Sequence, residues 1–465
     1  AHLSKKRIVW LPHSVSVSYT TAMNTTTNQR THAIVVGASL GGLMTARALS
    51  THFQQVTIVE RDTVNRQPES RHSQPQTQHL HGLLPGGFQA MMNYFPDLKQ
   101  ALADAGANVI DFTKEMIWYT HGGYRKSFAM DLPAVTMSRP LLEYLVRERV
   151  LALPNVTLID KCTVRQLTTT ADQQRVTGIS VQLKGAMQAD SLEADLVVDV
   201  SGRGSRSSHW LKDLGYVAPT TTEVKVKVGY ATRSFKRDPA DTRSKKWFIF
   251  TPEAPKEKQF CAVFPVEGDR WIMSAGGWHG EHELKDGQSF MEFVRNLPIP
   301  ELYDVIRQAE PLSDIVHYKF PSSLRRHYEN LNRFPLGYLV LGDAISSFNP
   351  IYGQGMTSAT MQAVALDKLL AKGTPDSKLA KRFFKQAATV VNIPWQMAVG
   401  EDFRYPETIG RKPAGIGIIN KYLSRVQRAT LHDEVVCAAF INVMSLLKQP
   451  TTLFHPRIFW RVMTA

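Results

Sequence analysis

A turn of small residues lies directly after the first strongly apolar segment of the 465-residue chain. The apolar run at 33–36 is typical of a buried strand, and the spacing over 40–49 predicts a helix. Between them lie Gly37, Ala38, Ser39, Leu40, Gly41 and Gly42. Gly37 permits a tight turn, Ser39 is small although GxGxxG has a glycine there, and Gly42 lets helix and strand pack. Because phosphate groups bind at such helix N-termini, the segment predicts a dinucleotide site.

An acidic residue supports this interpretation. Glu60 follows a strand predicted over 56–59, eighteen positions after Gly42. A carboxylate there can accept hydrogen bonds from an adenosine ribose. The alternative is a glycine turn followed by a chance acidic residue, but strand, helix and Glu60 occur in the order that dinucleotide binding needs. The predicted cofactor site also includes Arg61 and Val164.

A second glycine-bearing motif lies near the other end of the chain. Asp343 follows a strand predicted over 338–341, where its carboxylate can reach a ribose or ribityl hydroxyl. A helix is predicted over 354–370, and backbone amides at its start suit an electron-rich ring. A Gly-Asp turn is common, but a simple turn needs no further glycines. The predicted contacts are Gly342, Asp343, Pro350, Gly353, Gln354, Gly355 and Met356.

These two motifs, in this order and far apart in the sequence, resemble those of flavoprotein monooxygenases of the para-hydroxybenzoate hydroxylase type. The stretch NPIYGQGMT at 349–357 is most similar to the squalene epoxidase and bacterial polyether epoxidase branch. The resemblance extends from Thr31 to the C-terminus. It implies that the first motif binds the pyrophosphate of FAD and that the second contacts the ribityl chain and the flavin.

Two shorter stretches extend the resemblance. SRPLL at 138–142 resembles the helix start where the family places an arginine on the FAD phosphates, which implies that role for Arg139; its alternative is an ordinary surface arginine beside a cap. DLVVDVSGRGSR at 195–206 resembles the segment that serves FAD and NAD(P)H, but Ser201 replaces the family's aspartate and the arginine is displaced to Arg206. The resemblance implies NADPH or NADH as electron donor, with a separate reductase as the alternative.

The segment RHSQPQTQHLHGLL at 71–84 carries His79 and His81 on the same side of an extended chain. No third ligand accompanies them, and we predict no metal site. The family places this loop beside the cofactor, where either histidine donates a hydrogen bond or has a structural role. For a phenolic substrate, His81 or Tyr352 would be candidates for the catalytic base.

The resemblance implies an enzyme. It implies that reduced flavin would capture O2 as a hydroperoxide and transfer one oxygen atom to a lipophilic polyene, terpenoid or polyketide-like substrate, by epoxidation or hydroxylation. Aromatic-rich strands between Trp247 and Trp278 agree with an apolar pocket. The alternatives are a prenyl-type reductase or dehydrogenase, a flavin-dependent halogenase, whose WxWxIP signature is absent, and a non-enzymatic redox sensor or membrane-associated scaffold.

Composition constrains partners and location. The formal net charge is +14, but the basic residues are scattered and do not alternate with aromatics in a stripe, so nucleic acid is not an expected partner. Three distant cysteines, Cys162, Cys261 and Cys437, favour a reducing, cytoplasmic setting. No apolar run has the length of a membrane span. The positive charge and the apolar C-terminal helices predict at most a peripheral membrane association.

The order of patterns predicts an α/β protein: a Rossmann-like FAD-binding domain, an inserted antiparallel-sheet substrate domain and a helical C-terminal part. The predicted cofactor domain comprises residues 31–75, 135–215 and 335–382. The predicted substrate domain comprises 76–134 and 216–334, with strands over 224–230, 247–250, 261–266 and 271–275. Residues 383–465 are the helical region, residues 1–30 an N-terminal extension, and Met23 the predicted native start.

Overall fold

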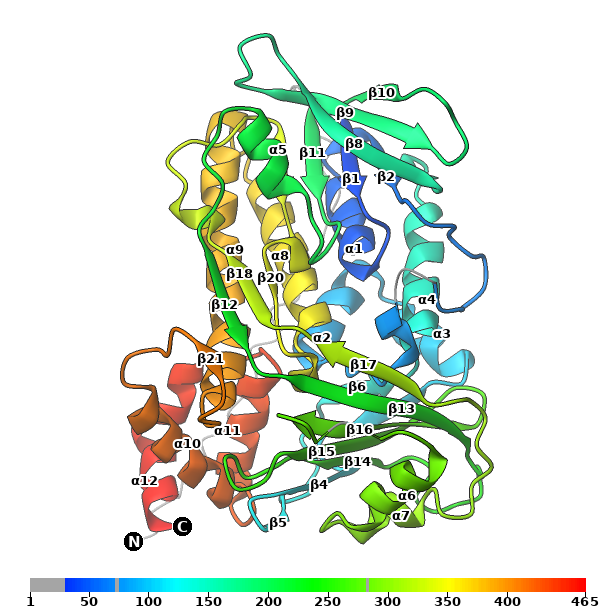
Figure 1. Cartoon of the computed structure of the whole chain (residues 1–465), viewed down its shortest axis with the longest axis vertical. Helices are drawn as coiled ribbons and strands as arrows, with labels where there is room; N and C mark the ends of the chain where they lie inside the picture. Colours follow the sequence, from blue (N-terminus) through cyan, green and yellow to red (C-terminus); the bar gives the residue numbers. More distant parts are fainter. Residues whose placement is uncertain (1–29, 72–74, 282–283) are drawn as a thin grey trace, which may run out of the picture.

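The computed structural model describes residues 30–71, 75–281 and 284–465, arranged as Figure 1 shows. Within these residues, the first layer is a sheet of five parallel strands in the order β19, β11, β1, β2 and β7. Their bounds are Tyr338–Val340, Leu196–Asp199, Arg30–Val36, Phe53–Val59 and Val156–Ile159. Ala33, Ile34 and Val35 on the central strand are fully buried, as expected when both faces of a parallel sheet are covered. The predicted Rossmann-like sheet is confirmed.

Long helices pack against this sheet. They are α1 (Leu40–Leu49), α4 (Arg139–Leu151), α8 (Gly355–Ala371) and α9 (Asp376–Asp402). Helix α1 contacts both α4 and α8, and α9 packs on α8. The Ser138 hydroxyl caps α4 by accepting a hydrogen bond from the Leu141 amide, and Pro140 stands in the first turn.

Smaller elements extend the cofactor layer. An antiparallel sheet of β8 (Cys162–Thr169), β9 (Val176–Leu183) and β10 (Asp190–Glu193) lies at one end, at the top of Figure 1. Other short elements are α2 (Pro85–Tyr94), α3 (Leu98–Asp104), the pair β3 (Asn108–Asp111) and β6 (Pro133–Thr136), and α5 (Ser207–Asp213). Short 3-10 helices are η1 (Pro75–Gln78), η2 (Tyr328–Asn330), η3 (Gly342–Ala344), η4 (Pro350–Tyr352) and η5 (Pro450–Phe454).

The second layer is a sheet that, in the described part of the chain, has seven strands in the order β17, β13, β16, β15, β14, β4 and β5. Their bounds are Val316–Phe320, Val228–Lys236, Arg270–Trp278, Gln259–Val266, Trp247–Phe250, Met116–Thr120 and Gly123–Tyr124. Phe248 and Phe250 pack in a core with helices α6 (Gly287–Arg295) and α7 (Pro300–Asp304). Trp247 and Ile249 face a cavity on the other side. Successive side chains of β14 therefore point alternately into a closed core and towards the cavity.

A narrow sheet joins the two layers. Its strands β20, β18, β12 and β21 have the bounds Ser346–Ser347, Ser323–Arg326, Thr221–Lys225 and Ile409–Gly410. The prediction of one strand over 224–230 is wrong, because β12 ends at Lys225 and β13 begins at Val228 in a different sheet. Lys227 has a φ of 42°, a left-handed conformation that interrupts the strand between them.

The C-terminal part is helical, with α10 (Ile416–Ala429), α11 (Glu434–Met444) and α12 (Pro456–Thr464) gathered at one corner of the molecule (Figure 1). The predicted boundary between residues 382 and 383 falls inside α9, which runs unbroken from Asp376. Met23 and the predicted extension up to residue 29 lie outside the described residues. None of the helices in the described ranges combines the length and apolarity needed to cross a membrane.

Candidate active site

A cavity of about 1030 Å³ lies between the two layers. Every residue that the sequence assigned to the site lines it, with the exception of Gly42. These residues are Gly37, Ser39, Leu40, Gly41, Glu60, Arg61, His81, Arg139, Val164, Gly342, Asp343, Pro350, Tyr352, Gly353, Gln354, Gly355 and Met356. The fold therefore brings the two glycine motifs, from opposite ends of the chain, to one cavity.

Two glycines of the first turn have no room for a side chain. Gly37 has a φ of 109°, and a Cβ added there would lie 2.8 Å from the carbonyl oxygen of Val200. A Cβ on Gly42 would lie 1.8 Å from the Gly37 carbonyl, so Gly42 serves the packing of α1 against the turn and not the cavity wall. The Ser39 side chain does not cap α1, and the Leu40 amide donates only a long hydrogen bond to Glu143 (3.4 Å), so the start of this helix is suited to an anion.

Charged side chains surround the start of α1. Glu60 accepts a hydrogen bond from the Ala38 amide (2.8 Å), and its Oε2 lies 3.4 Å from Nη1 of Arg71. Arg71 also reaches Glu143 (3.4 Å), which Arg139 contacts at 2.9 Å. Burial acts to raise the pKa of Glu143, but Arg139 and Arg71 outweigh it and hold this pKa below its ordinary value. The network keeps the Arg139 guanidinium at the cavity wall.

Sequence reasoning missed two members of this network. Glu143 stands four positions after Arg139 on a predicted helix, a spacing that indicates an ion pair and could have identified it. Arg71 lies in a segment without periodicity, so no local signal shows that it turns back to Glu60.

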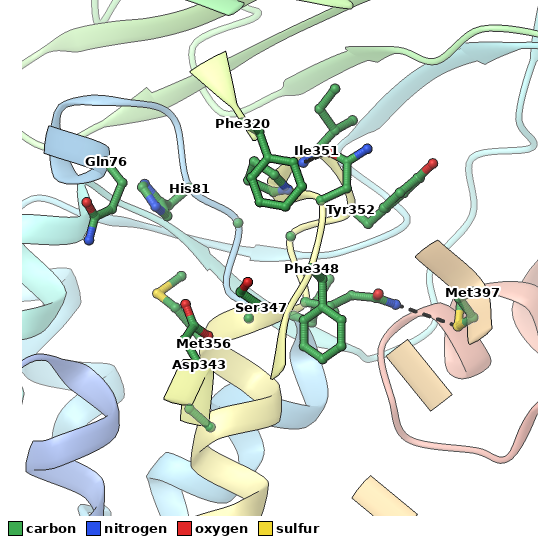
Figure 2. A pocket seen from close by; sticks show the side chains of 18 of the residues that line it. Gln76, His81, Phe320, Asp343, Ser347, Phe348, Ile351, Tyr352, Met356 and Met397 are labelled. Carbon is green, nitrogen blue, oxygen red and sulfur yellow. Dashed lines mark hydrogen bonds between the residues drawn. The ribbon is translucent and has the colours of Figure 1, made fainter. Parts of the chain in front are cut away.

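The second motif presents an open carboxylate to the same cavity. Asp343 follows β19, and no hydrogen bond joins its carboxylate to another of the described residues. Removal of the Asp343 carboxyl group from bulk water raises its pKa, although the positive charges of Arg139 and Arg203 act to lower it. Figure 2 shows Asp343 and Met356 pointing into the cavity. His81, on the segment before α2, points into the same cavity. This is the arrangement expected of a carboxylate that accepts hydrogen bonds from ligand hydroxyls.

The loop after β11 completes the polar wall. Asp199 accepts hydrogen bonds from the Ser201 amide (2.9 Å) and the Ser205 hydroxyl (2.6 Å), which hold the loop closed. Arg203 donates to the hydroxyls of Ser322 and Ser347, each at 2.6 Å. The segment that departs from the family pattern is therefore fastened to the narrow sheet beside the cavity.

The two histidines of the 71–84 segment have different surroundings. His79 is buried and its Nδ1 lies 2.7 Å from the Thr232 hydroxyl, so its role is structural. His81 lines the cavity, and its Nδ1 donates to the His79 carbonyl (2.9 Å), which leaves Nε2 as an acceptor. Burial and the nearby Arg139 lower the pKa of His81 to about 3, so the ring is neutral at physiological pH. In the described residues, no cluster of three metal-ligating side chains accompanies them.

A buried carboxyl group from α9 ties three parts of the molecule together. Oδ1 of Asp402 accepts hydrogen bonds from the Tyr352 hydroxyl (2.9 Å), the Asn349 amide (3.0 Å) and the Trp278 indole (3.2 Å). Its Oδ2 has no hydrogen-bond partner among the described residues. Burial raises the pKa of Asp402 to about 7, against the effect of the three donors. Nothing in the helical pattern around residue 402 indicated this role.

Tyr352 is accordingly unsuited to act as a base. Its hydroxyl proton is donated to Asp402, and burial raises the pKa of Tyr352 well above its ordinary value. This corrects the role considered for Tyr352 from the sequence. The residue instead links the second glycine motif to α9.

Beyond the polar wall, the cavity continues between the seven-stranded sheet and the C-terminal helices. Its lining there is aromatic and aliphatic, with Trp118, Trp247, Ile249, Phe260, Phe264, Leu423 and Phe440. The Arg125 guanidinium lies 4.3 Å from the Trp118 ring centre and 4.4 Å from that of Phe440, and donates to the Thr430 hydroxyl (2.6 Å). We call this part the apolar chamber.

The polar wall fits a dinucleotide. It combines a turn that excludes a Cβ at Gly37, an uncapped helix start for phosphates, and the open carboxylate of Asp343 for hydroxyl groups. The volume of about 1030 Å³ lies at the upper end of the range of roughly 300–1,000 Å³ for small-molecule sites, and the cavity extends past the polar wall into the apolar chamber.

Comparison with known protein families also supports dinucleotide binding. The FAD binding domain family matches residues 30–390. The chain belongs to this family. The FAD domain match includes both glycine motifs, the parallel sheet and the seven-stranded sheet, and it ends inside α9. The fold class predicted from the sequence is confirmed, and FAD is the cofactor for which the family is named.

Individual relatives agree with this assignment. Protein Rv3254 of Mycobacterium tuberculosis is 32% identical over 447 residues, which cover 90% of each chain. PqsL, a probable FAD-dependent monooxygenase from Pseudomonas aeruginosa, has a TM-score of 0.58 and 18% identity over 80% of this chain and 97% of its own. The flavin-dependent brominase Bmp2 has a TM-score of 0.63 and 14% identity over 93% and 98% of the two chains. At such identities, the two structures show a shared fold.

Proposed function

We propose that this chain is an FAD-dependent monooxygenase that transfers one oxygen atom from O2 to a lipophilic substrate by epoxidation or hydroxylation. The observation that carries the proposal is the continuity of the cavity, whose cofactor wall passes directly into the apolar chamber of Trp118, Trp247 and Phe264. Such a chamber excludes water and selects an apolar carbon skeleton. The resemblance of NPIYGQGMT to epoxidases supports a polyene, terpenoid or polyketide-like substrate.

Different residues would hold each part of FAD. The Gly37 turn, the start of α1 and Arg139 suit the pyrophosphate, and Glu60 suits the adenosine ribose. Asp343 suits the ribityl hydroxyls, and the start of α8 at Gly355 suits the flavin ring. When bound and reduced, FAD supplies the electrons that activate O2, so that one oxygen atom passes to the substrate and the other leaves as water.

His81 contributes a polar contact to this reaction. Its neutral ring presents Nε2 as an acceptor, because Nδ1 is held by the His79 carbonyl. A group with a pKa of about 3 does not collect a proton at neutral pH. Oxygen transfer to an alkene needs no protein base, so the low pKa of His81 agrees with an alkene substrate.

We propose NADPH or NADH as the source of electrons, bound directly or through a separate reductase. Arg203 and Arg206 line the cavity and offer positive charge to a phosphate-bearing donor. Anaerobic addition of NADPH to the FAD-loaded protein separates the two routes. Bleaching of the flavin supports direct reduction, whereas an unchanged spectrum indicates a reductase.

The function is tested by oxygen incorporation. FAD-loaded protein is supplied with isotopically labelled O2, an electron donor and a panel of polyenes, terpenoids and phenols, and the products are analysed by mass spectrometry. We expect one labelled oxygen atom in a lipophilic product, with Gly37→Val as the flavin-deficient control and Met187→Ala, a change on the exposed surface, as the unaffected one. An unlabelled product would identify a reductase if it is reduced or a dehydrogenase if it is desaturated, and a halogenated product would identify a halogenase.

A further inference from the structure

Large apolar side chains are exposed on the C-terminal helices. In the described ranges, twelve large hydrophobic side chains are exposed, and half of them lie between residues 418 and 463. We call these six the C-terminal apolar surface: Ile418, Ile419, Phe454, Phe459, Trp460 and Met463. Ile418 is 78% exposed and Trp460 is 71% exposed, values at which a side chain contributes little to the protein core. A group of exposed apolar side chains on neighbouring elements indicates an interaction surface.

Contacts join Phe454, Phe459 and Met463 of this surface to α10. The Tyr422 ring on α10 stacks on Phe454 (4.9 Å between ring centres) and on Phe459 (5.5 Å). Arg425, one turn further along α10, reaches the sulfur of Met463 at 3.2 Å. Ile418 lies one turn before Tyr422 on the same helix face. Helices α10 and α12 thus present one apolar surface at the corner seen in Figure 1.

The charge around this surface is positive. Residues 409–465 contain eight lysines and arginines but only two acidic residues, Asp433 and Glu434. Asp433 is already paired with Arg461 at 2.7 Å. The exposed basic side chains are Arg411, Lys412, Lys421, Arg425, Lys448 and Arg457, together with Arg428, which pairs with Glu253 at 2.6 Å. Aromatic and aliphatic residues together with lysine and arginine suit an anionic lipid surface, whereas two copies of a positive surface repel each other.

The same surface lies at an entrance to the cavity. Ile419 and Phe454 are exposed to solvent and also line the cavity, so the cavity opens between α10 and η5. Ile416, Leu423 and Leu453 continue this lining inward towards the apolar chamber. A molecule that arrives at the C-terminal apolar surface therefore has an apolar route to the cofactor wall.

We propose that the C-terminal apolar surface docks on the anionic face of a lipid bilayer without crossing it. Trp460, Phe459 and Ile418 enter the interface between headgroups and acyl chains, while the basic side chains contact anionic headgroups. A second step rests on the proposed function: the lipophilic substrate passes from the bilayer between Ile419 and Phe454 into the cavity.

Vesicle flotation tests the docking step. FAD-loaded protein is mixed with vesicles of phosphatidylcholine alone or of an equimolar mixture with phosphatidylglycerol. We expect binding to the anionic vesicles that weakens with added salt. The double variant Ile418→Glu/Trp460→Glu should bind about tenfold or more weakly, because two carboxylates replace the inserted side chains. Its matched control, Met187→Glu/Val217→Glu, adds the same charge at two exposed apolar positions elsewhere and should bind as the wild type does.

The outcomes are distinguishable. Bound flavin and melting temperature verify that both variants are folded, since all four side chains are exposed. Absence of binding to anionic vesicles, or equal loss in both double variants, would overturn the proposal. Self-association that only Ile418→Glu/Trp460→Glu abolishes, without vesicle binding, would assign the surface to a second copy of the chain. Since flotation requires no turnover, docking can be confirmed even if the monooxygenase proposal fails.

Discussion

Two aspartates of the site stand in opposite surroundings. Asp343 faces open space and receives no hydrogen bond from the described residues, whereas Asp402 is fully buried and accepts three hydrogen bonds on one oxygen. Their surroundings raise the pKa of both carboxyl groups. Asp343 can therefore accept hydrogen bonds from a ligand, whereas Asp402 holds protein elements together.

Asp343→Ala should weaken FAD without unfolding the protein. The variant loses charge-assisted hydrogen bonds to ligand hydroxyls, worth about 1.5–3 kcal/mol, so we expect a rise of roughly 10–100-fold in the dissociation constant of FAD. Fluorescence titration of the apoprotein with FAD measures this change. The melting temperature of the apoprotein should not fall, because no protein group loses a partner. An unchanged FAD affinity would show that the second motif is only a turn.

Gly37→Val should abolish retention of FAD. A side chain at this position meets the Val200 carbonyl and the left-handed backbone disfavours it, so the turn cannot keep its shape at the phosphates. The flavin absorbance per protein of the purified variant measures the effect. Gly417→Ala is the control, because a Cβ there meets nothing within 4 Å and the residue is exposed. A Gly37→Val protein that stays fully loaded with FAD would contradict the assignment.

At the scale of elements, α9 joins parts that the sequence separates. Its last residue, Asp402, binds Trp278 at the end of β16 and both Asn349 and Tyr352 of the second motif. The seven-stranded sheet, the second motif and the end of α9 therefore meet at one carboxyl group.

Asp402→Asn should change the pH dependence of stability. The pKa of Asp402 is about 7 in the folded protein against an ordinary 3.8, so between these values only the folded state holds the proton. Wild-type stability consequently falls as pH rises through this window, and the asparagine variant lacks that loss. Its melting temperature relative to wild type should therefore increase from about pH 4 to about pH 7.

Asp402→Ala is the contrasting variant. It leaves three buried donors without an acceptor, each at about 1–3 kcal/mol, so we expect a loss of at least about 3 kcal/mol in the free energy of unfolding across the pH range. Thermal unfolding monitored by circular dichroism distinguishes the two variants. An equal loss of stability in both variants would contradict the role of the hydrogen bonds. A stability difference between the asparagine variant and wild type that does not change with pH would contradict the raised pKa of Asp402.

At the scale of the whole molecule, the cavity is enclosed by elements from both halves of the chain. The start of α1 and the start of α8 face it from the parallel sheet, while β14 and β15 close it from the second layer. A cofactor bound there contacts segments that are remote in sequence. Binding should therefore stabilise the fold as a unit.

Removal of FAD should lower the melting temperature. A ligand at 100 times its dissociation constant stabilises a protein by about 2.7 kcal/mol, so the melting temperature should recover in proportion to the logarithm of added FAD. Calorimetry of the apoprotein at increasing FAD concentration tests this. Two separate transitions, of which FAD shifts only one, would show that the layers unfold independently.

The sequence alone determined the cofactor fold, because its signals are local. The apolar run before Gly37, the small residues of the turn and the glycines near Asp343 each need only neighbouring residues to be recognised. The site residues predicted from these signals line one cavity, except Gly42, whose hydrogen atom faces the Gly37 carbonyl. Helix starts and turns depend on short-range sterics, which sequence patterns report.

Tertiary structure decided what depends on distant contacts. Arg71 and Asp402 acquire their roles from partners brought together only by folding, and Lys227 divides a pattern that looks continuous into strands of two sheets. The length of α9 and the opening between Ile419 and Phe454 likewise follow from packing between elements. Hydrogen bonds and contacts between distant segments have no periodic signature in a single chain, so these features become visible only in three dimensions.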